Sequence, residues 1–163
     1  MRIAITGHRG LPEDTMRLVD RAIRTELDQY PPQDLVGISC LADGADQIFA
    51  QAVLDQGGHL EVVVPASEYR DELPQEAHQT YDALLARAVN VHRLDRRKSD
   101  PEAHVEASKL MMADADRLIA VWDSQPARGY GGTADVVTLA RDRGLAVTII
   151  WPTGARRDAS AVA

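Results

Sequence analysis

The sequence WDSQPARGYGGTAD, from Trp122 to Asp135, joins an expected strand to an expected helix. The apolar run 118–121 precedes it, and the helical pattern that follows carries Thr133 and Asp135 in its first turn. A glycine-rich connection of this kind lets backbone N–H groups and a helix N-terminus face one ligand, which suits phosphate. The stretch therefore predicts a strand, turn and helix that together bind a phosphorylated small molecule.

Short apolar runs alternate with longer helical segments along the rest of the chain. One helical stripe is formed by Met16, Val19, Ile23 and Leu27, which recur at the spacing of a helix face. This alternation predicts an α/β fold, a Rossmann-like three-layer α/β/α arrangement with a mainly parallel sheet of about six strands. The expected strands are residues 3–6, 35–40, 60–64, 89–94, 118–121 and 146–151.

The composition indicates one globular domain. Of the 163 residues, 45% are hydrophobic, which is ordinary for a single domain with its own core. We expect residues 1–152 to form this domain and residues 153–163 to be a flexible C-terminal tail. The net charge of −7, from 18 Lys and Arg against 25 Asp and Glu, disfavours nucleic acid as a partner.

Cysteine usage and hydropathy predict the compartment. Cys40 is the single cysteine, so the chain has no intrachain disulfide, in keeping with a reducing cytoplasm. The N-terminal residues have no apolar core of the signal-peptide type, and the apolar run 145–151 is too short to span a bilayer. We expect a soluble cytoplasmic protein that does not interact with a membrane.

In an open parallel sheet, ligands bind beyond the carboxyl ends of the strands, near the point where the strand order reverses. Five loops are expected to meet there, and glycines and charged residues are concentrated in them. These loops are residues 7–10, 41–46, 65–70, 95–99 and the turn that ends in residues 129–133.

The first loop contains neither the dinucleotide pattern GxGxxG nor the P-loop pattern GxxxxGK[ST]. Gly7 permits close approach of a ligand, Arg9 has the charge to bind phosphate or carboxylate, and His8 can donate a hydrogen bond. For both side chains a structural role is the alternative. In the second loop, Gly44 lies at an expected helix start beside Asp46, which either contacts a ribose hydroxyl or caps the helix.

At this point three ordered segments resemble one superfamily. Gly7-His8-Arg9 is similar to its Gly-Ser-Arg start, and residues 42–46 resemble its Gly-Ala-Arg-Gly-Ala-Asp pattern. Residues 119–123, followed by Gly131-Gly132-Thr133 and Arg143-Gly144, resemble its fifth strand and closing helix. The chain is thereby identified as a member of the SLOG superfamily, the Rossmann-like group that includes LOG phosphoribohydrolases and the DNA-processing protein DprA. The resemblance extends from Arg2 to about Pro152.

The resemblance implies a binding or sensing module for a nucleotide or a nucleotide-derived phosphorylated ligand. The phosphate would lie in the turn 129–133, and the base or ribose would reach toward the first two loops. Tyr130 can stack on a base, and Asp123 either contacts the ligand or sets the turn after its strand. The expected ligand-binding residues are Gly7, His8, Arg9, Gly44, Asp123, Arg128, Gly129, Tyr130, Gly131, Gly132 and Thr133.

The alternative function is that of a LOG-like phosphoribohydrolase, which cleaves the N-glycosidic bond of a nucleoside 5′-monophosphate. LOG enzymes carry the pattern Pro-Gly-Gly-x-Gly-Thr-x-x-Glu, and its glutamate position falls on Val136. Asp135 is one residue earlier, at a helix azimuth that differs by roughly 100°. The candidate catalytic carboxylates are therefore Asp135 and Asp46, and whether the chain is an enzyme stays open.

The basic run 96–98 is either a solvated loop or a contact for a second phosphate, as in a molecule of the adenosine-diphosphate-ribose type. The five histidines lack the spacing of a metal site, so neither a metal nor a cofactor is predicted. Binding of single-stranded DNA is the least favoured function, because the chain is acidic and has few aromatic residues for stacking.

A homodimer or higher homo-oligomer is expected, because LOG-like proteins are typically dimers. The helix that carries Leu110, Met111 and Met112 is the candidate interface, with burial in the core as the alternative for both methionines.

Overall fold

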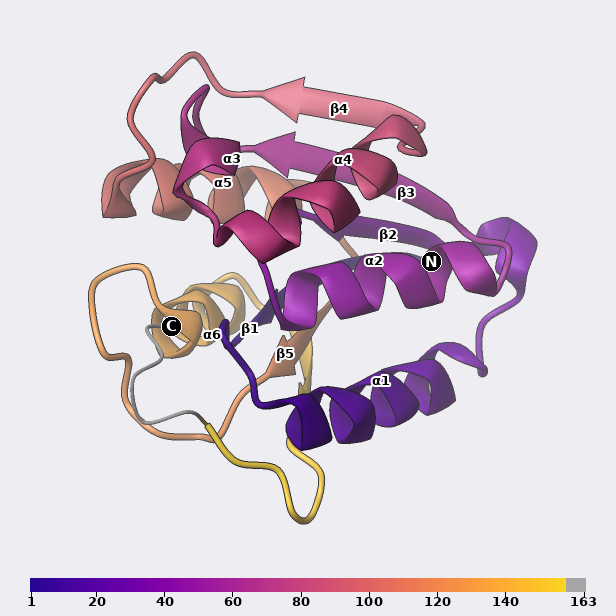
Figure 1. The fold of residues 1–163 in the computed structure, drawn as a ribbon. Coiled ribbons are helices and arrows are strands. Elements are labelled where there is room, and N and C mark those ends of the chain that lie inside the picture. Colours follow the sequence, from indigo (N-terminus) through magenta and orange to yellow (C-terminus); the bar gives the residue numbers. More distant parts are fainter. Residues whose placement is uncertain (158–163) are drawn as a thin grey trace.

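The computed structural model describes residues 1–157 and contains one six-stranded sheet in which every neighbouring pair of strands is parallel (Figure 1). The strand order is β4-β3-β2-β1-β5-β6. All six strands overlap the predicted apolar runs, so the predicted parallel sheet is confirmed. The strands are β1 (Arg2–Gly7), β2 (Val36–Ser39), β3 (His59–Val64), β4 (Asn90–Arg93), β5 (Arg117–Val121) and β6 (Ala146–Ile150).

Helices cover both faces of the sheet, which gives the expected three layers (Figure 1). Helices α1 (Glu13–Leu27), α2 (Ala45–Asp55) and α4 (His78–Ala86) lie on one face, and α5 (Pro101–Ala113) and α6 (Thr133–Asp142) lie on the other. Strand β1 shows how the layers form, because Ile3 and Ile5 pack with α1 and α2 while Ala4 packs with the α5 and α6 residues. The remaining elements are the short helix α3 (Tyr69–Glu72) and two single 3₁₀ turns, Pro32–Asp34 and Gln75–Ala77.

The strand order reverses between β1 and β5, where the site is expected. Gly7, the last residue of β1, pairs with Val121, the last residue of β5. A Cβ atom on Gly7 would lie 2.4 Å from Cβ of Ala45, so the start of α2 packs directly on the strand end. The loops after β1, β2 and β5 therefore begin close together at one edge of the sheet.

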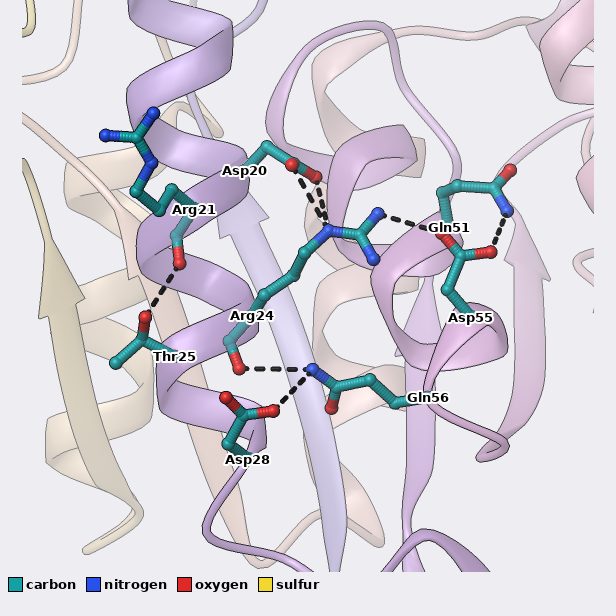
Figure 2. A network of polar contacts seen from close by, with 8 residues as sticks. All are labelled: Asp20, Arg21, Arg24, Thr25, Asp28, Gln51, Asp55 and Gln56. Atoms are coloured by element: carbon teal, nitrogen blue, oxygen red, sulfur yellow. Dashed lines mark hydrogen bonds and ion pairs between the residues drawn. The ribbon is translucent and has the colours of Figure 1, made fainter.

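A polar network fastens α1 to α2 (Figure 2). The guanidinium of Arg24 bonds Asp20 on its own helix and Asp55 on α2, with an Nη2 to Oδ2 distance of 2.9 Å. Gln56 Nε2 donates to the carbonyl oxygen of Arg24 at 3.1 Å and to Oδ1 of Asp28 at 3.0 Å. The site loops precede the N-termini of these two helices, and the network joins the helices toward their C-terminal ends.

The segment after β6 returns to the start of α1. The backbone N–H of Arg156 donates to Oγ1 of Thr15 at 3.0 Å, and that hydroxyl donates to the carbonyl oxygen of Arg156 at 3.1 Å. Of the predicted flexible tail 153–163, residues 158–163 lie outside the described residues, so its flexibility stays a prediction.

The methionines of α5 belong to the core. Met111 and Met112 are each 4% exposed, whereas Leu110 is 40% exposed. The interface role predicted for both methionines is therefore wrong, because their side chains pack inside this chain, and the core alternative holds. Among residues 1–157, no helix is both long and apolar enough to cross a membrane.

Candidate functional site

A pocket of about 360 Å³ lies at the carboxyl edge of the sheet, and all five predicted loops contribute to it. Its floor is largely apolar and includes Ile5, Val136 and Met111. Cys40, the single cysteine, is buried at this floor with its Sγ atom 3.6 Å from Sδ of Met111. The five loops supply, in chain order, Gly7 and Arg9; Ala42 and Asp46; Pro65 and Tyr69; Ser99; and residues 129–133.

The glycine-rich turn ends at the N-terminus of α6. Gly132 is the N-cap residue, and no side chain caps the helix. Gly131 has a φ of +82°, which an L side chain rarely adopts, and the N–H of Gly132 donates to the carbonyl oxygen of Gly129 at 3.3 Å. The uncapped N–H groups of the first helical turn are thus available to an acceptor in the pocket. This end of the pocket is suited to an anion.

Asp135, a predicted catalytic residue, is turned away from the central pocket. Its Oδ2 atom accepts the N–H of Gly131 at 2.9 Å, so it stabilises the turn. Its side chain lines a neighbouring hollow between α5 and α6, together with Lys109 and Thr138. Val136, the position that the LOG pattern assigns to glutamate, lines the central pocket instead.

Arg9 supplies positive charge to the pocket. Its Nε atom donates to Oδ1 of Asp43 at 2.8 Å, and the other carboxylate oxygen accepts the N–H of Gly10 at 3.0 Å. The side chain of Arg9 is 34% exposed, so the guanidinium is held by Asp43 but not enclosed. Asp43 therefore positions a cation at the pocket.

His8 lies beneath the turn and is not a lining residue of the pocket. The side chain is 2% exposed, and Nε2 accepts the backbone N–H of Asp123 at 3.1 Å. Nδ1 lies 3.5 Å from Oγ1 of Thr133, and the ring contacts Trp151 edge-on. Burial lowers the pKa of His8, and the positive charge of Arg157 lowers it further. The imidazole connects the loops after β1 and β5, and its Nε2 atom also lies 3.1 Å from Oδ1 of Asp123.

Asp123 and Arg128 both belong to the segment that follows β5. Asp123 Oδ1 accepts the N–H of Gln125 at 3.0 Å, so Asp123 sets the turn after β5. Arg157, which the sequence did not single out, places Nη1 3.6 Å from Oδ2 of Asp123, with 5% of its side chain exposed. The charge of Arg128 lowers the pKa of both His8 and Arg157.

Of the two residues predicted in the second loop, Asp46 lines the pocket and Gly44 does not. Gly44 caps α2 with a φ of +86°, and a Cβ atom there would lie 2.7 Å from the carbonyl oxygen of His8. It lines a groove between α1 and α2, away from the central pocket. Asp46 does line the central pocket, where Oδ2 accepts the N–H of Ala42 at 3.2 Å. Burial raises the pKa of Asp46 to about 7.

The pocket residues that sequence reasoning missed include Tyr69, Ser99 and His104. His104 Nε2 lies 2.8 Å from Oγ of Ser99, and its ring contacts Tyr69 edge-on with centroids 5.8 Å apart. Burial lowers the pKa of His104, and the nearby charge of Arg9 lowers it further. Tyr69 and Ser99 lie in predicted site loops, so their positions in the sequence could have indicated a place at the site. His104 lies within helix α5, outside those loops.

The basic run 96–98 is paired on the surface. Arg96 Nε donates to Oε2 of Glu106 at 2.5 Å, and Arg97 Nη1 lies 3.5 Å from Oε1 of Glu68. Neither arginine lines the central pocket. Across residues 1–157, no group of three His, Cys, Asp or Glu side chains is placed to hold a metal ion.

Known proteins were compared with the sequence and with the fold. No family model and no curated protein matches the sequence. Similar solved structures include DprA of Streptococcus pneumoniae, with a TM-score of 0.67, 18% identity, and coverage of 94% of this chain and 51% of that chain. DprA of Helicobacter pylori gives a TM-score of 0.68 with 16% identity, over 96% of this chain and 68% of that chain. The molybdenum cofactor carrier protein of Chlamydomonas reinhardtii gives 0.57 with 14% identity, over 91% and 74%.

The chain has a Rossmann-like α/β fold similar to the folds of these proteins. The predicted fold class is therefore confirmed. The sequence identities are low, so these matches show the fold alone. The chain spans about half the length of the S. pneumoniae protein, 51%. The H. pylori structure concerns the binding of single-stranded DNA, and the C. reinhardtii protein carries the molybdenum cofactor. Proteins with similar folds thus bind different ligands, so the fold alone does not identify the ligand of this chain.

Proposed function

We propose that this chain is a binding or sensing module for a nucleotide-derived phosphorylated ligand, which occupies the central pocket. One observation carries the proposal: a single cavity is lined by the glycine-rich turn, the first residue of the uncapped helix α6 and the cation Arg9. Backbone N–H groups, a helix N-terminus and a guanidinium favour the same ligand group, a phosphate.

The ligand would lie with its phosphate at Gly131, Gly132 and Thr133, within reach of Arg9. The apolar floor, which includes Val136 and Met111, then receives the less polar part of the ligand. The predicted ligand residues divide accordingly. Those proposed to touch the ligand are Gly7, Arg9, Gly129, Tyr130, Gly131, Gly132 and Thr133, and those proposed to support them are His8, Gly44, Asp123 and Arg128.

A second candidate function is hydrolysis of the N-glycosidic bond of a nucleoside 5′-monophosphate. The observation that favours it is Asp46, a pocket carboxyl whose pKa burial raises to about 7. Such a group can donate a proton to a leaving base and can also be ionised near neutral pH. Asp46 is better placed for this role than Asp135, whose carboxylate is bonded to Gly131 and faces another hollow.

Titration calorimetry with the four ribonucleoside 5′-monophosphates tests the binding proposal, with the melting temperature as a second readout. We expect Arg9→Gln to weaken binding about tenfold, the cost of one charge-assisted hydrogen bond. The matched control is Arg96→Gln, which removes an arginine that is paired with Glu106 outside the pocket and should leave affinity unchanged. If neither these nucleotides nor adenosine-diphosphate-ribose raises the melting temperature at saturation, both candidate functions are wrong.

The hydrolase candidate is tested by the release of free base and ribose 5-phosphate from the same nucleotides. Base release that is lost in Asp46→Asn and kept in Asp135→Asn would make hydrolysis the function. Base release that is lost only in Asp135→Asn would mean that Asp135 is the catalytic residue. Binding without release leaves the sensing module as the function.

Two partner predictions are tested separately. Single-stranded DNA binding remains the least favoured function because the chain carries a net charge of −7. A salt-dependent mobility shift of labelled oligonucleotide would reverse this order. A homo-oligomer is proposed through the exposed side of α5 that includes Leu110, and light scattering of the purified protein measures the state directly.

A further inference from the structure

Ser99 and His104 form a polar pair on the α5 side of the pocket. Both side chains line the cavity, and Nε2 of His104 lies 2.8 Å from Oγ of Ser99. The ring of His104 is held edge-on against Tyr69, a buried residue that also contacts Tyr81. The pair is therefore preorganised, since one member is hydrogen-bonded and its ring is fixed by packing.

Helix capping does not account for this pair. The N-cap of α5 is Asp100, whose Oδ1 atom accepts the N–H of Ala103 at 2.8 Å. Ser108, another hydroxyl at the pocket, donates to the carbonyl oxygen of His104 at 2.9 Å and so bonds its own helix. The Ser99 and His104 side chains instead bond each other at the cavity wall.

The pair lies close to the proposed phosphate position. A Cβ atom built on Gly131 would come within 3.3 Å of the carbonyl oxygen of Pro101, so the start of α5 abuts the glycine-rich turn. Ser99 is two residues before Pro101, and His104 is one turn after it. The part of a 5′-phosphorylated ligand that follows directly on its phosphate is the sugar, and this part lies nearest to the pair.

The chemistry of the pair suits hydroxyl groups. The bond between Ser99 and His104 uses one donor and one acceptor, and the pair still offers a donor and an acceptor to a sugar hydroxyl, which can act as both. His104 is kept neutral because burial and the charge of Arg9 both lower its pKa. A second phosphate is not favoured there, because Arg96 and Arg97 are paired with Glu106 and Glu68 and do not line the cavity.

We propose that Ser99 and His104 bind the ribose hydroxyls of the ligand, so that the pocket selects a ribonucleotide over its 2′-deoxy counterpart. This inference rests on the proposed phosphate site in the turn. It goes beyond that function because it names the sugar that the pocket accepts and the two residues that recognise it. A site built to hydrogen-bond a hydroxyl discriminates against the analogue that lacks it, because its own polar groups are left unpaired.

The test compares AMP, GMP, CMP and UMP with their 2′-deoxy forms by titration calorimetry. In the unmodified chain we expect at least one ribonucleotide to bind about tenfold more tightly than its deoxy form. Ser99→Ala and His104→Phe should reduce that ratio to about one, while the affinity for the deoxy form stays the same. Phenylalanine retains a ring against Tyr69, which limits the loss of packing. His59→Phe, at an exposed histidine outside the pocket, should keep the full preference.

The outcomes separate this inference from the function on which it rests. If both nucleotide series bind equally to the unmodified chain, sugar recognition is wrong and the phosphate site stands. If the ribonucleotide preference survives in both Ser99→Ala and His104→Phe, these residues are not its source and the inference is overturned. If neither series binds, the proposed function fails and the inference fails with it. Melting curves of each variant establish that it is folded before its affinity is compared.

Discussion

Nε2 of His8 lies 3.1 Å from the backbone nitrogen of Asp123, and this hydrogen bond joins the loops that follow β1 and β5. The backbone N–H of His8 donates to the carbonyl oxygen of Val121 at 3.1 Å. The two loops on either side of the strand-order reversal are thus coupled through one buried side chain. An imidazole can accept the Asp123 N–H only when Nε2 is unprotonated.

His8 is therefore expected to resist protonation in the folded chain. Burial and the charge of Arg157 lower its pKa below the ordinary value of 6.5, so the folded state binds fewer protons than the unfolded state. The stability from His8 is complete above about pH 6.5 and is lost as the pH falls through the folded pKa. Nitrogen chemical shifts of the His8 ring over pH 5–8 measure this directly.

Arg157→Gln should raise the pKa of His8, because it removes a positive charge that opposes protonation. Arg156→Gln is the matched control, since Arg156 pairs with Asp14 on the surface. An unchanged His8 titration in Arg157→Gln would mean that burial and the charge of Arg128 set the shift without Arg157.

For Asp46, the expected effect of pH on stability is opposite to that for His8. Burial raises its pKa from 3.8 to about 7, so the folded chain keeps a proton that the unfolded chain releases. The unfolding free energy should therefore decrease as the pH rises from about 4 to about 7, and level off above. Asp46→Asn is neutral throughout and should lack this decrease, which makes it more stable than the unmodified chain at pH 8 by on the order of a few kcal/mol.

Urea unfolding at several pH values compares the two chains. Asp142→Asn, which changes an exposed aspartate on α6, should keep the pH profile of the unmodified chain. A parallel profile for Asp46→Asn and the unmodified chain would show that Asp46 ionises normally in the pocket.

The fold was predictable because its signals are local. Alternation of apolar runs with helical stripes gave six parallel strands, and the general rule for open sheets placed five loops at one pocket. What the sequence did not contain was the direction of each side chain. His8 and Arg9 are neighbours, yet one is buried under the turn and the other lines the pocket.

Side-chain directions elsewhere in the site could not be predicted from the sequence either. Asp135 and Val136 differ by one helix step, which decides that the carboxylate faces away from the pocket. The Ser99 and His104 contact depends on how α5 packs beside the turn, a long-range feature. Leu41 adopts a φ of +59° where the chain leaves β2, and its residue type gives no indication of that conformation.

Asp100 tests how strongly the helix cap supports the pocket. Asp100→Ala removes the bond to the N–H of Ala103 and should cost about 1 kcal/mol of unfolding free energy. Asp100→Asn is the rescue variant, because an amide oxygen can accept the same N–H. Chemical denaturation of the three chains checks both expectations, and equal losses in the two variants would assign the effect to charge.

Gly7 and Gly129 both line the pocket but differ in the space around them. A Cβ atom on Gly7 would lie 2.4 Å from Cβ of Ala45 and 2.9 Å from Cβ of Val121, whereas one on Gly129 meets nothing within 4 Å. Gly7→Ala should therefore destabilise the fold by about 1–3 kcal/mol or more, because α2 and β5 would have to separate. Gly129→Ala should change the unfolding free energy by less than about 0.5 kcal/mol. Denaturation of both variants measures the difference, and a Gly129→Ala chain as unstable as Gly7→Ala would mean that the turn packs more tightly than its open surroundings indicate.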